Sequence, residues 1–364
     1  MRVELSDEQE FLRDAVAGVV ARDAAPSAVR AWAQARASDA AHALAVRQGW
    51  TGIGVDEDRG GQGGGVIELA VLAEQLGRGA VPWDRTLAAI LAARLLSASD
   101  AEAATALAEI AAEGARGVAP AIDGRVPLTA ASPSLRVAGG RVTGALRHVL
   151  AAGEADTLVL AVAGDEDGAV ALYAVATEAD GVTVTPRALV DGTRSLADVV
   201  FADAPAEALG TIPAEALVAV GRAAAVALAA DALGAAEALL DMTVAYVKER
   251  QQFGVPVGSF QAVKHGAAQM LVDVEGARAA VHYGAWAVDA GSEDAGAHAA
   301  VAKAQACDAA FRVADRALFL HGAVGYTWEH DLQFAFKRIK SDRLLLGSPD
   351  AHRDLLAAEL LAAA

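Results

Sequence analysis

The spacing of apolar residues divides the chain into three zones. From about residue 6 to residue 114, apolar positions recur at helical spacing and are interrupted at glycine and proline. From about 115 to 210 the pattern changes to short, valine-rich runs bounded by Gly or Asp. From Pro213 onwards the helical period returns in long segments. We therefore predict an α+β fold with an N-terminal helical domain, a small antiparallel β domain and a C-terminal four-helix bundle. These domains cover residues 1–114, 115–211 and 212–364.

Local signals place individual elements within these domains. Ser6, followed by Glu8 and Gln9, can cap the first helix. The apolar face of that helix contains Phe11, Leu12, Val16 and Val20. The clearest strands are expected over 157–162, 169–175 and 182–185. The four C-terminal helices are expected over 213–250, 260–290, 295–322 and 351–361.

Composition and charge restrict the classes of partner. The chain is 54% hydrophobic and 21% charged, which is ample for a buried core. Its net charge of −17 argues against binding to nucleic acid or to an anionic membrane surface. A single cysteine, Cys307, excludes an internal disulfide and a cysteine-based zinc cluster. Apolar runs such as 223–230 are much shorter than the ~20 residues that span a bilayer, and the first 14 residues lack the apolar core of a signal peptide. We expect a soluble, cytoplasmic protein without membrane insertion.

A glycine run at 59–65 has the composition of a phosphate-binding loop. It is not followed by Lys-Ser/Thr, and no clear strand precedes it. An ordinary flexible connection between two helices is therefore the preferred interpretation.

The segment 249–256, Glu-Arg-Gln-Gln-Phe-Gly-Val-Pro, is more informative. It places a cation and two amides at the end of a helix, beside an aromatic ring and a proline-restricted turn. Arg250 can grip a phosphate through two hydrogen bonds, while Phe253 offers a flat apolar face. The simpler alternative is that Arg250 only complements the negative end of the helix dipole.

A second segment, 319–331, carries a helix end into a loop with spaced glycines. Close approach of a ligand to the backbone explains both Gly322 and Gly325, whereas a helix cap alone explains only Gly322. His321 and His330 do not form an i, i+4 pair, so no metal site is predicted. The sequence also lacks a Gly-x-Ser-x-Gly motif, which makes nucleophilic acyl transfer an unfavoured function.

In this order, and within a helix–β–helix layout, the two segments resemble motifs of the acyl-CoA dehydrogenase family. They are similar to its Arg-x-x-Phe-Gly…Phe-Gln and His-Gly-Gly-x-Gly-Tyr-Thr motifs, and 74–77, Glu-Gln-Leu-Gly, matches an N-terminal feature. The resemblance covers the whole chain. It implies an FAD-dependent oxidoreductase, assembled as a tetramer, that removes hydrogens from Cα and Cβ of an acyl-CoA. A carboxylate takes the α proton, the flavin takes the hydride, and an electron-transfer flavoprotein is a possible acceptor.

The sequence departs from that family at the catalytic base. Aligned with the family, the position of the usual glutamate falls on Leu346, and the alternative position falls on Ala224. Neither side chain can take a proton. Asp342 and Asp350 flank the first position but would need a rearranged backbone to reach it. The identity of a catalytic residue in this chain is therefore unknown.

A second departure concerns the flavin ring. The family holds the isoalloxazine through hydroxyl groups of the β domain, but the matching segments here, 117–124 and 148–150, contain no Ser or Thr. The family holds the adenine and pyrophosphate end through the neighbouring chain, and this sequence keeps those positions. They are Arg250, Gln252, Phe253, Gln261, His321, Gly322 and Gly325.

This separation of kept and lost residues suggests a division of labour between two subunits. We expect a half-site subunit that completes the flavin site of a homologous, glutamate-bearing partner and shares its acyl-CoA substrate. Two alternatives stay open. One is a self-sufficient flavoenzyme of the same fold, as a homodimer or homotetramer, with a displaced base or a base-independent oxidation. The other is a flavin-free binding or scaffolding protein.

Overall fold

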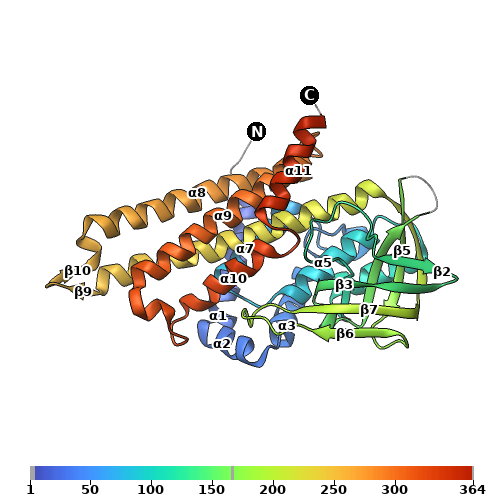
Figure 1. The fold of residues 1–364 in the computed structure, drawn as a ribbon, viewed down its shortest axis with the longest axis horizontal. Helices are drawn as coiled ribbons and strands as arrows, with labels where there is room; N and C mark the ends of the chain where they lie inside the picture. The colour runs from blue at the N-terminus through green and yellow to red at the C-terminus, as the bar shows by residue number, and fades with distance from the viewer. Residues whose placement is uncertain (1–4, 165–167, 363–364) are drawn as a thin grey trace. The chain divides into compact units, whose positions relative to one another are not determined.

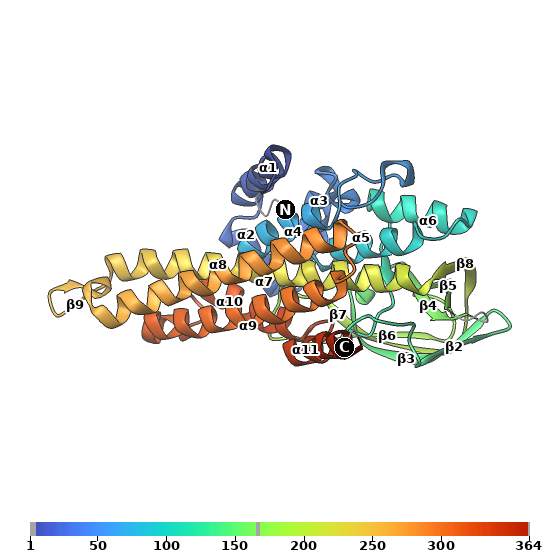
Figure 2. The same ribbon diagram turned by 90° about the horizontal axis from the view of Figure 1, so that it is seen from above.

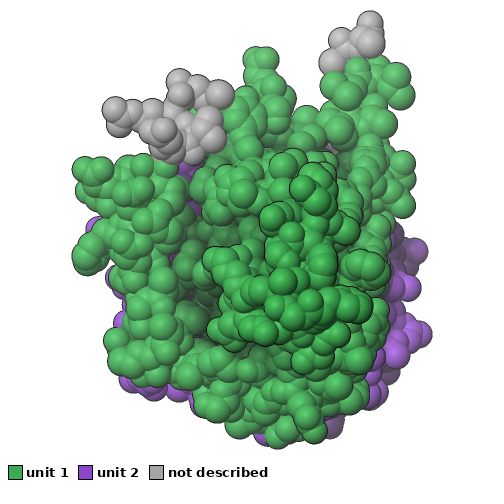
Figure 3. Space-filling view, turned by 90° about the vertical axis from the view of Figure 1, so that its left-hand side faces the viewer, with its two compact units in different colours: residues 1–34, 70–81, 225–364 green, residues 35–69, 82–224 purple. Residues whose placement is uncertain are grey.

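The computed structural model describes residues 5–164 and 168–362. Within it the chain forms two compact units, shown in different colours in Figure 3. Unit 1 contains 1–34, 70–81 and 225–364, and unit 2 contains 35–69 and 82–224. Both units are built from separate stretches of the chain, whereas our division into three domains follows the sequence order and remains a proposal.

Helices precede and follow a block of strands, which confirms the predicted α+β layout (Figure 1). The α-helices are α1 (Asp7–Asp23), α2 (Pro26–Ala35), α3 (Asp39–Arg47), α4 (Val66–Arg78), α5 (Asp84–Leu96), α6 (Glu102–Glu113), α7 (Ala214–Glu249), α8 (Gln261–Asp289), α9 (Ala295–His321), α10 (Leu332–Leu344) and α11 (Pro349–Ala362). The 3-10 turns are η1 (Trp50–Gly52), η2 (Glu57–Arg59), η3 (Ala152–Glu154), η4 (Val257–Ser259) and η5 (Gly322–Tyr326). The strands are β1 (Val118–Pro120), β2 (Leu135–Ala138), β3 (Arg141–Leu150), β4 (Thr157–Ala163), β5 (Ala169–Ala176), β6 (Val182–Pro186), β7 (Leu196–Pro205), β8 (Glu207–Pro213), β9 (Gln251–Gln252) and β10 (Val255–Pro256).

Unit 2 contains two four-stranded sheets, with strand orders β1-β4-β5-β8 and β2-β3-β7-β6. Among the strands that the structure describes here, β1 and β4 are the one parallel pair, so the predicted antiparallel domain needs this correction. Strand β3 was not predicted from the sequence, because apolar and polar residues do not alternate regularly along it. Its register against β7 shifts between Val142 and Gly144 and again between Leu146 and Val149, and such bulges disrupt the period of two.

The glycine run forms a tight loop in unit 2. A bridge joins Val55 to Gly63, and a Cβ atom on Gly61 would lie 2.0 Å from the carbonyl oxygen of Val55. Glycine is therefore required at 61 by the packing of the loop against itself. The packing of the loop therefore explains the glycine at 61, and no phosphate ligand is needed to explain it.

The long helices of unit 1 lie alongside one another, and α9 packs against α8, α10 and α11 (Figures 1 and 2). Helix α10 was not predicted, because its charged residues conceal its apolar period. One of them, Arg338, is fully buried and binds Asp231 of α7 at 3.1 Å and the carbonyl of Val81 at 2.8 Å. Paired and hydrogen-bonded, this guanidinium can occupy a core position that sequence patterns assign to apolar residues.

Helix α1 begins as predicted but does not use every apolar residue for packing. Ser6 and Gln9 form a reciprocal capping box, which fixes the helix start. Val16 and Val20 are buried, whereas Phe11 is 77% exposed, so its assignment to the same face was wrong. At about 100° per residue, Phe11 lies roughly 140° around the helix from Val16, on its solvent side.

Helix α7 is the one helix in the described part of the chain that is long and apolar enough to cross a bilayer by length and composition. The protein buries 78% of its most apolar stretch. That burial is typical of the core helix of a soluble fold.

Candidate functional site

The two predicted ligand-binding segments meet in unit 1. After α7 the chain forms the β9–β10 hairpin, which is the tip beyond α7 and α8 in Figures 1 and 2. The second segment begins where α9 ends at His321. The ring of Tyr246, near the end of α7, stacks on the ring of His321 with centroids 4.5 Å apart and planes inclined by 19°. The ends of α7 and α9 are therefore in direct contact.

Arg250 is an exposed cation at the base of the hairpin. Its backbone is fixed on both sides: the N–H donates to the carbonyl of Tyr246 at 2.8 Å, and the carbonyl accepts from Val257 at 2.7 Å. Its guanidinium forms no ion pair with any residue that the structure describes. An anion can therefore bind to this side chain without displacing an internal partner.

Phe253 presents its ring to solvent at the hairpin turn. It is 93% exposed, has a left-handed backbone with φ of 53°, and contacts Phe260 edge to face at 6.3 Å. A non-glycine residue in this conformation carries a backbone cost of roughly 1–2 kcal/mol. Gln252 and Gln261 are also exposed on the flanking elements. Exposed aromatic surface of this kind is typical of a contact with another molecule.

His321 supports the second segment from inside. It is only 3% exposed, and its Nδ1 lies 2.8 Å from the carbonyl of Ala317, so the ring hydrogen sits on Nδ1. Burial lowers the pKa of His321, which keeps the imidazole neutral. Its Nε2 atom has no hydrogen-bond partner in the described part of the chain. The neutral ring is thus a packing surface for Tyr246 and for His330, whose centroid lies 5.0 Å away.

The two glycines of this segment occupy different environments. Gly322 is exposed, with φ of 62°, and a Cβ atom there would meet nothing within 4 Å. Gly325 is buried, and a Cβ atom would lie 3.1 Å from that of His321. Gly322 therefore leaves its backbone open to solvent, and Gly325 allows the loop to close over the histidine.

Sequence reasoning missed two residues that organise this region. Tyr246 supplies the stack on His321, and Arg30 of α2 binds the loop that follows η5. Arg30 and its partner Trp328 are 298 positions apart, and no local pattern signals a contact at that separation. Only the fold brings them together.

The positions expected for a catalytic base carry hydrocarbon side chains in buried surroundings. Leu346 is 5% exposed, and its carbonyl accepts a hydrogen bond from His352 at 2.9 Å. Ala224 is fully buried in α7. Asp342 is buried at the end of α10, and Asp350 is an exposed residue that pairs with Arg353 at 2.7 Å. Neither position 346 nor position 224 can accept a proton.

The matching β-domain segments use their backbone within unit 2. Gly117 donates to Asp156 at 2.8 Å, and Gly124 donates to the carbonyl of Arg147 at 2.9 Å. His148 has a left-handed backbone, and its N–H donates to Asp198 at 3.1 Å. These backbone donors have internal partners, and the segments supply no hydroxyl group.

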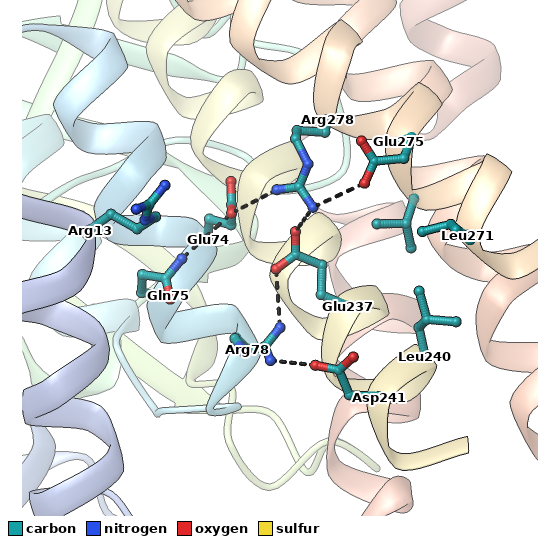
Figure 4. A pocket seen from close by; sticks show the side chains of 11 residues that line it. Arg13, Glu74, Gln75, Arg78, Glu237, Leu240, Asp241, Leu271, Glu275 and Arg278 are labelled. Atoms are coloured by element: carbon teal, nitrogen blue, oxygen red, sulfur yellow. Dashed lines mark hydrogen bonds and ion pairs between the residues drawn. The ribbon is translucent and has the colours of Figure 1, made fainter. Parts of the chain in front are cut away.

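A charged cavity of about 350 Å³ lies between α4, α7 and α8 (Figure 4). Arg278 binds Glu74 at 3.2 Å and also binds Glu237, while Arg78 binds Glu237 at 3.3 Å and Asp241 at 2.5 Å. Burial, and then the charge of Glu74, raise the pKa of Glu237 to about 7. Each of these two arginines is neutralised by carboxylates, so the cluster is an ion-pair network that joins three helices. Among the described residues no group of three His, Cys, Asp or Glu side chains could hold a metal ion.

Comparisons with known proteins find acyl-CoA dehydrogenases similar to this chain over nearly its whole length. Residues 6–114 match the family model "Acyl-CoA dehydrogenase, N-terminal domain", and residues 216–361 match "Acyl-CoA dehydrogenase, C-terminal domain". The acyl-CoA dehydrogenase IpdE2 of Mycolicibacterium smegmatis is 32% identical over 98% of this chain and 100% of its own length. The ChsE4–ChsE5 complex of Mycobacterium tuberculosis contains a similar chain, with a TM-score of 0.87 and 28% identity over 99% of each chain. A steroid acyl-CoA dehydrogenase variant, Tcur3481–Tcur3483 G363A, has a TM-score of 0.87 and 25% identity over 98% of each chain.

Proposed function

Because this chain belongs to the acyl-CoA dehydrogenase family, we propose that it is the half-site subunit of a heteromeric enzyme and completes the flavin site of a homologous catalytic subunit. FAD as the cofactor, and oxidation of CH–CH bonds as the reaction class, follow from family membership. Our proposal adds to these family properties that the flavin site is shared between two different chains.

The observation that carries this proposal is an asymmetry within one polypeptide. Leu346 and Ala224 stand where the family has its base, and both are buried hydrocarbon side chains. By contrast Arg250, Phe253 and Gly322 are exposed at the meeting point of α7 and α9. A chain that had lost all function would have no reason to keep one end of the cofactor site and lose the other.

The exposed residues fit the nucleotide end of FAD. Arg250 would bind the pyrophosphate oxygens, for which its planar guanidinium has matching geometry. Phe253 would cover an apolar face of the nucleotide, and Gly322 would let its backbone approach closely. When bound, FAD supplies the hydride acceptor. This chain supplies orientation of the nucleotide and exclusion of water around it.

The partner supplies what this chain lacks. We propose a homologous subunit with a glutamate at the position equivalent to 346, which removes the α proton of a shared acyl-CoA substrate. The ChsE4–ChsE5 structure supports this arrangement, since it is a complex named for two chains. The similar steroid acyl-CoA dehydrogenase supports a bulky acyl group. An electron-transfer flavoprotein as acceptor and a cytoplasmic location complete the proposal.

The test is to replace Arg250 within the native complex, purified through a tag on this chain. Arg250→Ala removes charged hydrogen bonds to phosphate of about 1.5–3 kcal/mol, so FAD affinity falls roughly 10- to 100-fold. Arg136→Ala is the matched control, because Arg136 is an exposed arginine of β2 that forms no ion pair with a described residue. Unchanged FAD affinity in Arg250→Ala would contradict the proposal. A complex that contains no flavin at all would support a scaffolding role instead.

A further inference from the structure

Arg30 of α2 holds the loop between η5 and α10 with one guanidinium. Its Nη1 donates to the carbonyl of Trp328 at 2.9 Å. Its Nη2 donates to the carbonyl of Glu329 at 2.8 Å and to the carboxylate of Asp331 at 2.5 Å. The guanidinium also lies 5.2 Å from the ring centroid of Phe334. Two of the three hydrogen bonds go to backbone oxygens and therefore fix the path of the chain itself.

The same loop is held by polar contacts rather than by burial. The ring of Trp328 is largely exposed, and Lys337 lies over it with its Nζ 3.5 Å from the centroid. Gln333 adds a hydrogen bond to the carbonyl of Trp328 at 2.5 Å. Because little apolar burial orders the loop, loss of Arg30 would remove a large share of what holds it.

Arg30 acts on one end of the segment that contains the ligand-facing glycine. At the other end His321 is fixed by its stack on Tyr246. Between these ends, Thr327 is tied back to the carbonyl of Val324 by its N–H at 3.1 Å and its hydroxyl at 2.8 Å. The backbone around Gly322 is thus held between two anchors, and the second anchor is supplied by α2.

We propose that Arg30 is a positioning residue that pre-orders the 322–331 loop for the adenylate half of the flavin. This inference rests on the proposed function, because it assigns Arg30 a role in the same nucleotide site. The helix that carries Arg30 contributes little to the core, since Val29 is its one buried residue. Without Arg30 the loop must be ordered on binding, so the apparent affinity falls in proportion to the fraction of molecules in which the loop is already ordered.

The experiment compares FAD with FMN, which lacks the adenylate. In the flavin-depleted native complex, Arg30→Met should weaken FAD binding by roughly 10-fold if the ordered loop falls to about a tenth of the population. FMN affinity should not change. Arg30→Lys should be intermediate, because a lysine can keep the pair with Asp331 but not both carbonyl contacts. Arg22→Met is the matched control: Arg22 is an exposed arginine of α1 that pairs with its neighbour Asp23.

Hydrogen exchange gives a second readout that does not depend on flavin. The backbone amides of 324–331 should exchange faster in Arg30→Met than in the wild-type chain or Arg22→Met. An unchanged exchange rate together with unchanged FAD affinity would overturn the inference, while loss of FAD in Arg250→Ala would leave the proposed function standing. Equal weakening of FAD and FMN would mark Arg30 as merely structural and overturn it too. If Arg250→Ala also has no effect on FAD, both proposals fail.

Discussion

The rings of Tyr246 and His321 are stacked, with centroids 4.5 Å apart and planes inclined by 19°, and join the last turns of α7 and α9. Tyr246 precedes the first segment that the sequence marks as ligand-binding, and His321 belongs to the second. The stack therefore couples the Arg250 hairpin to the Gly322 loop through neutral, partly buried aromatic surface. The geometry of the candidate site depends on this contact as much as on the exposed residues.

Tyr246→Ala should destabilise the protein and weaken FAD binding together. An aromatic pair contributes about 0.5–1.5 kcal/mol beyond its buried area, so we expect a loss of about 1–2 kcal/mol in the free energy of unfolding, measured in urea. Tyr246→Phe is the control, since it keeps the ring and should behave like the wild type. A Tyr246→Ala protein with unchanged stability and flavin affinity would show that the stack is incidental.

Lys303→Met should reduce stability strongly. Lys303 is fully buried in α9, and its Nζ donates to the carbonyls of Asp342 at 2.6 Å and Gly347 at 3.2 Å. Methionine leaves both carbonyls without this donor, which costs about 2–4 kcal/mol. Lys340→Met is the control, because Lys340 is only partly buried and lies over Phe311, so its loss should cost less than about 1 kcal/mol. Equal effects of the two variants would contradict the burial argument.

Glu237 should make stability fall as the pH rises through neutrality. Its pKa is raised from 4.5 to about 7, mainly by burial, so the native state holds a proton that the unfolded state releases. The resulting stabilisation is complete below about pH 4.5 and is lost as the pH rises through 7. Relative to the wild type, Glu237→Gln should therefore gain roughly 2–3 kcal/mol between pH 5 and pH 8, measured by urea unfolding. Glu275→Gln, which removes an exposed partner of Arg278, is the control variant for loss of a carboxylate from the same ion-pair network.

His352 should make the stability fall as the pH is lowered below 6.5, which is the opposite pH dependence to that of Glu237. Burial lowers its pKa to about 4. As the pH falls, the unfolded state therefore binds a proton near pH 6.5, whereas the native state binds it only near pH 4. Stability from this residue is present above pH 6.5 and is lost as the pH falls towards 4. His352→Gln should lower stability at pH 7, where the hydrogen bond to Leu346 is altered, but flatten the decline between pH 6.5 and 4. An unchanged acid slope would show that His352 is not buried as described.

Much of the fold could be predicted because its signals are local. The capping box at Ser6 and the glycine after α9 mark helix ends within a few residues, and the predicted long helices differ from α7, α8 and α9 by at most one residue at each end. Helix α10 was not predicted, because a buried ion pair replaces apolar residues on the face that packs in the core. Strand β3 was not predicted, because two bulges break the alternation of apolar and polar residues along it.

The residues that the sequence assigns to the candidate site all lie in two short segments. Arg250, Phe253 and Gly322 belong to short motifs, and their chemistry can be recognised from residue type and spacing. The supporting contacts of Tyr246 and Arg30 depend on helices brought together by the fold, so sequence alone gives no reason to select them. The burial of His321 likewise required the structure, which places it behind the loop as a support.

The FAD content of this chain, purified alone and in its native complex, decides whether it is a half-site subunit. We expect almost no flavin and no acyl-CoA oxidation for the isolated, folded chain. We expect one FAD per pair of unlike chains in the complex, with oxidation dependent on the partner's glutamate. One FAD per chain together with turnover by the isolated protein would rule out the half-site role and establish a self-sufficient flavoenzyme.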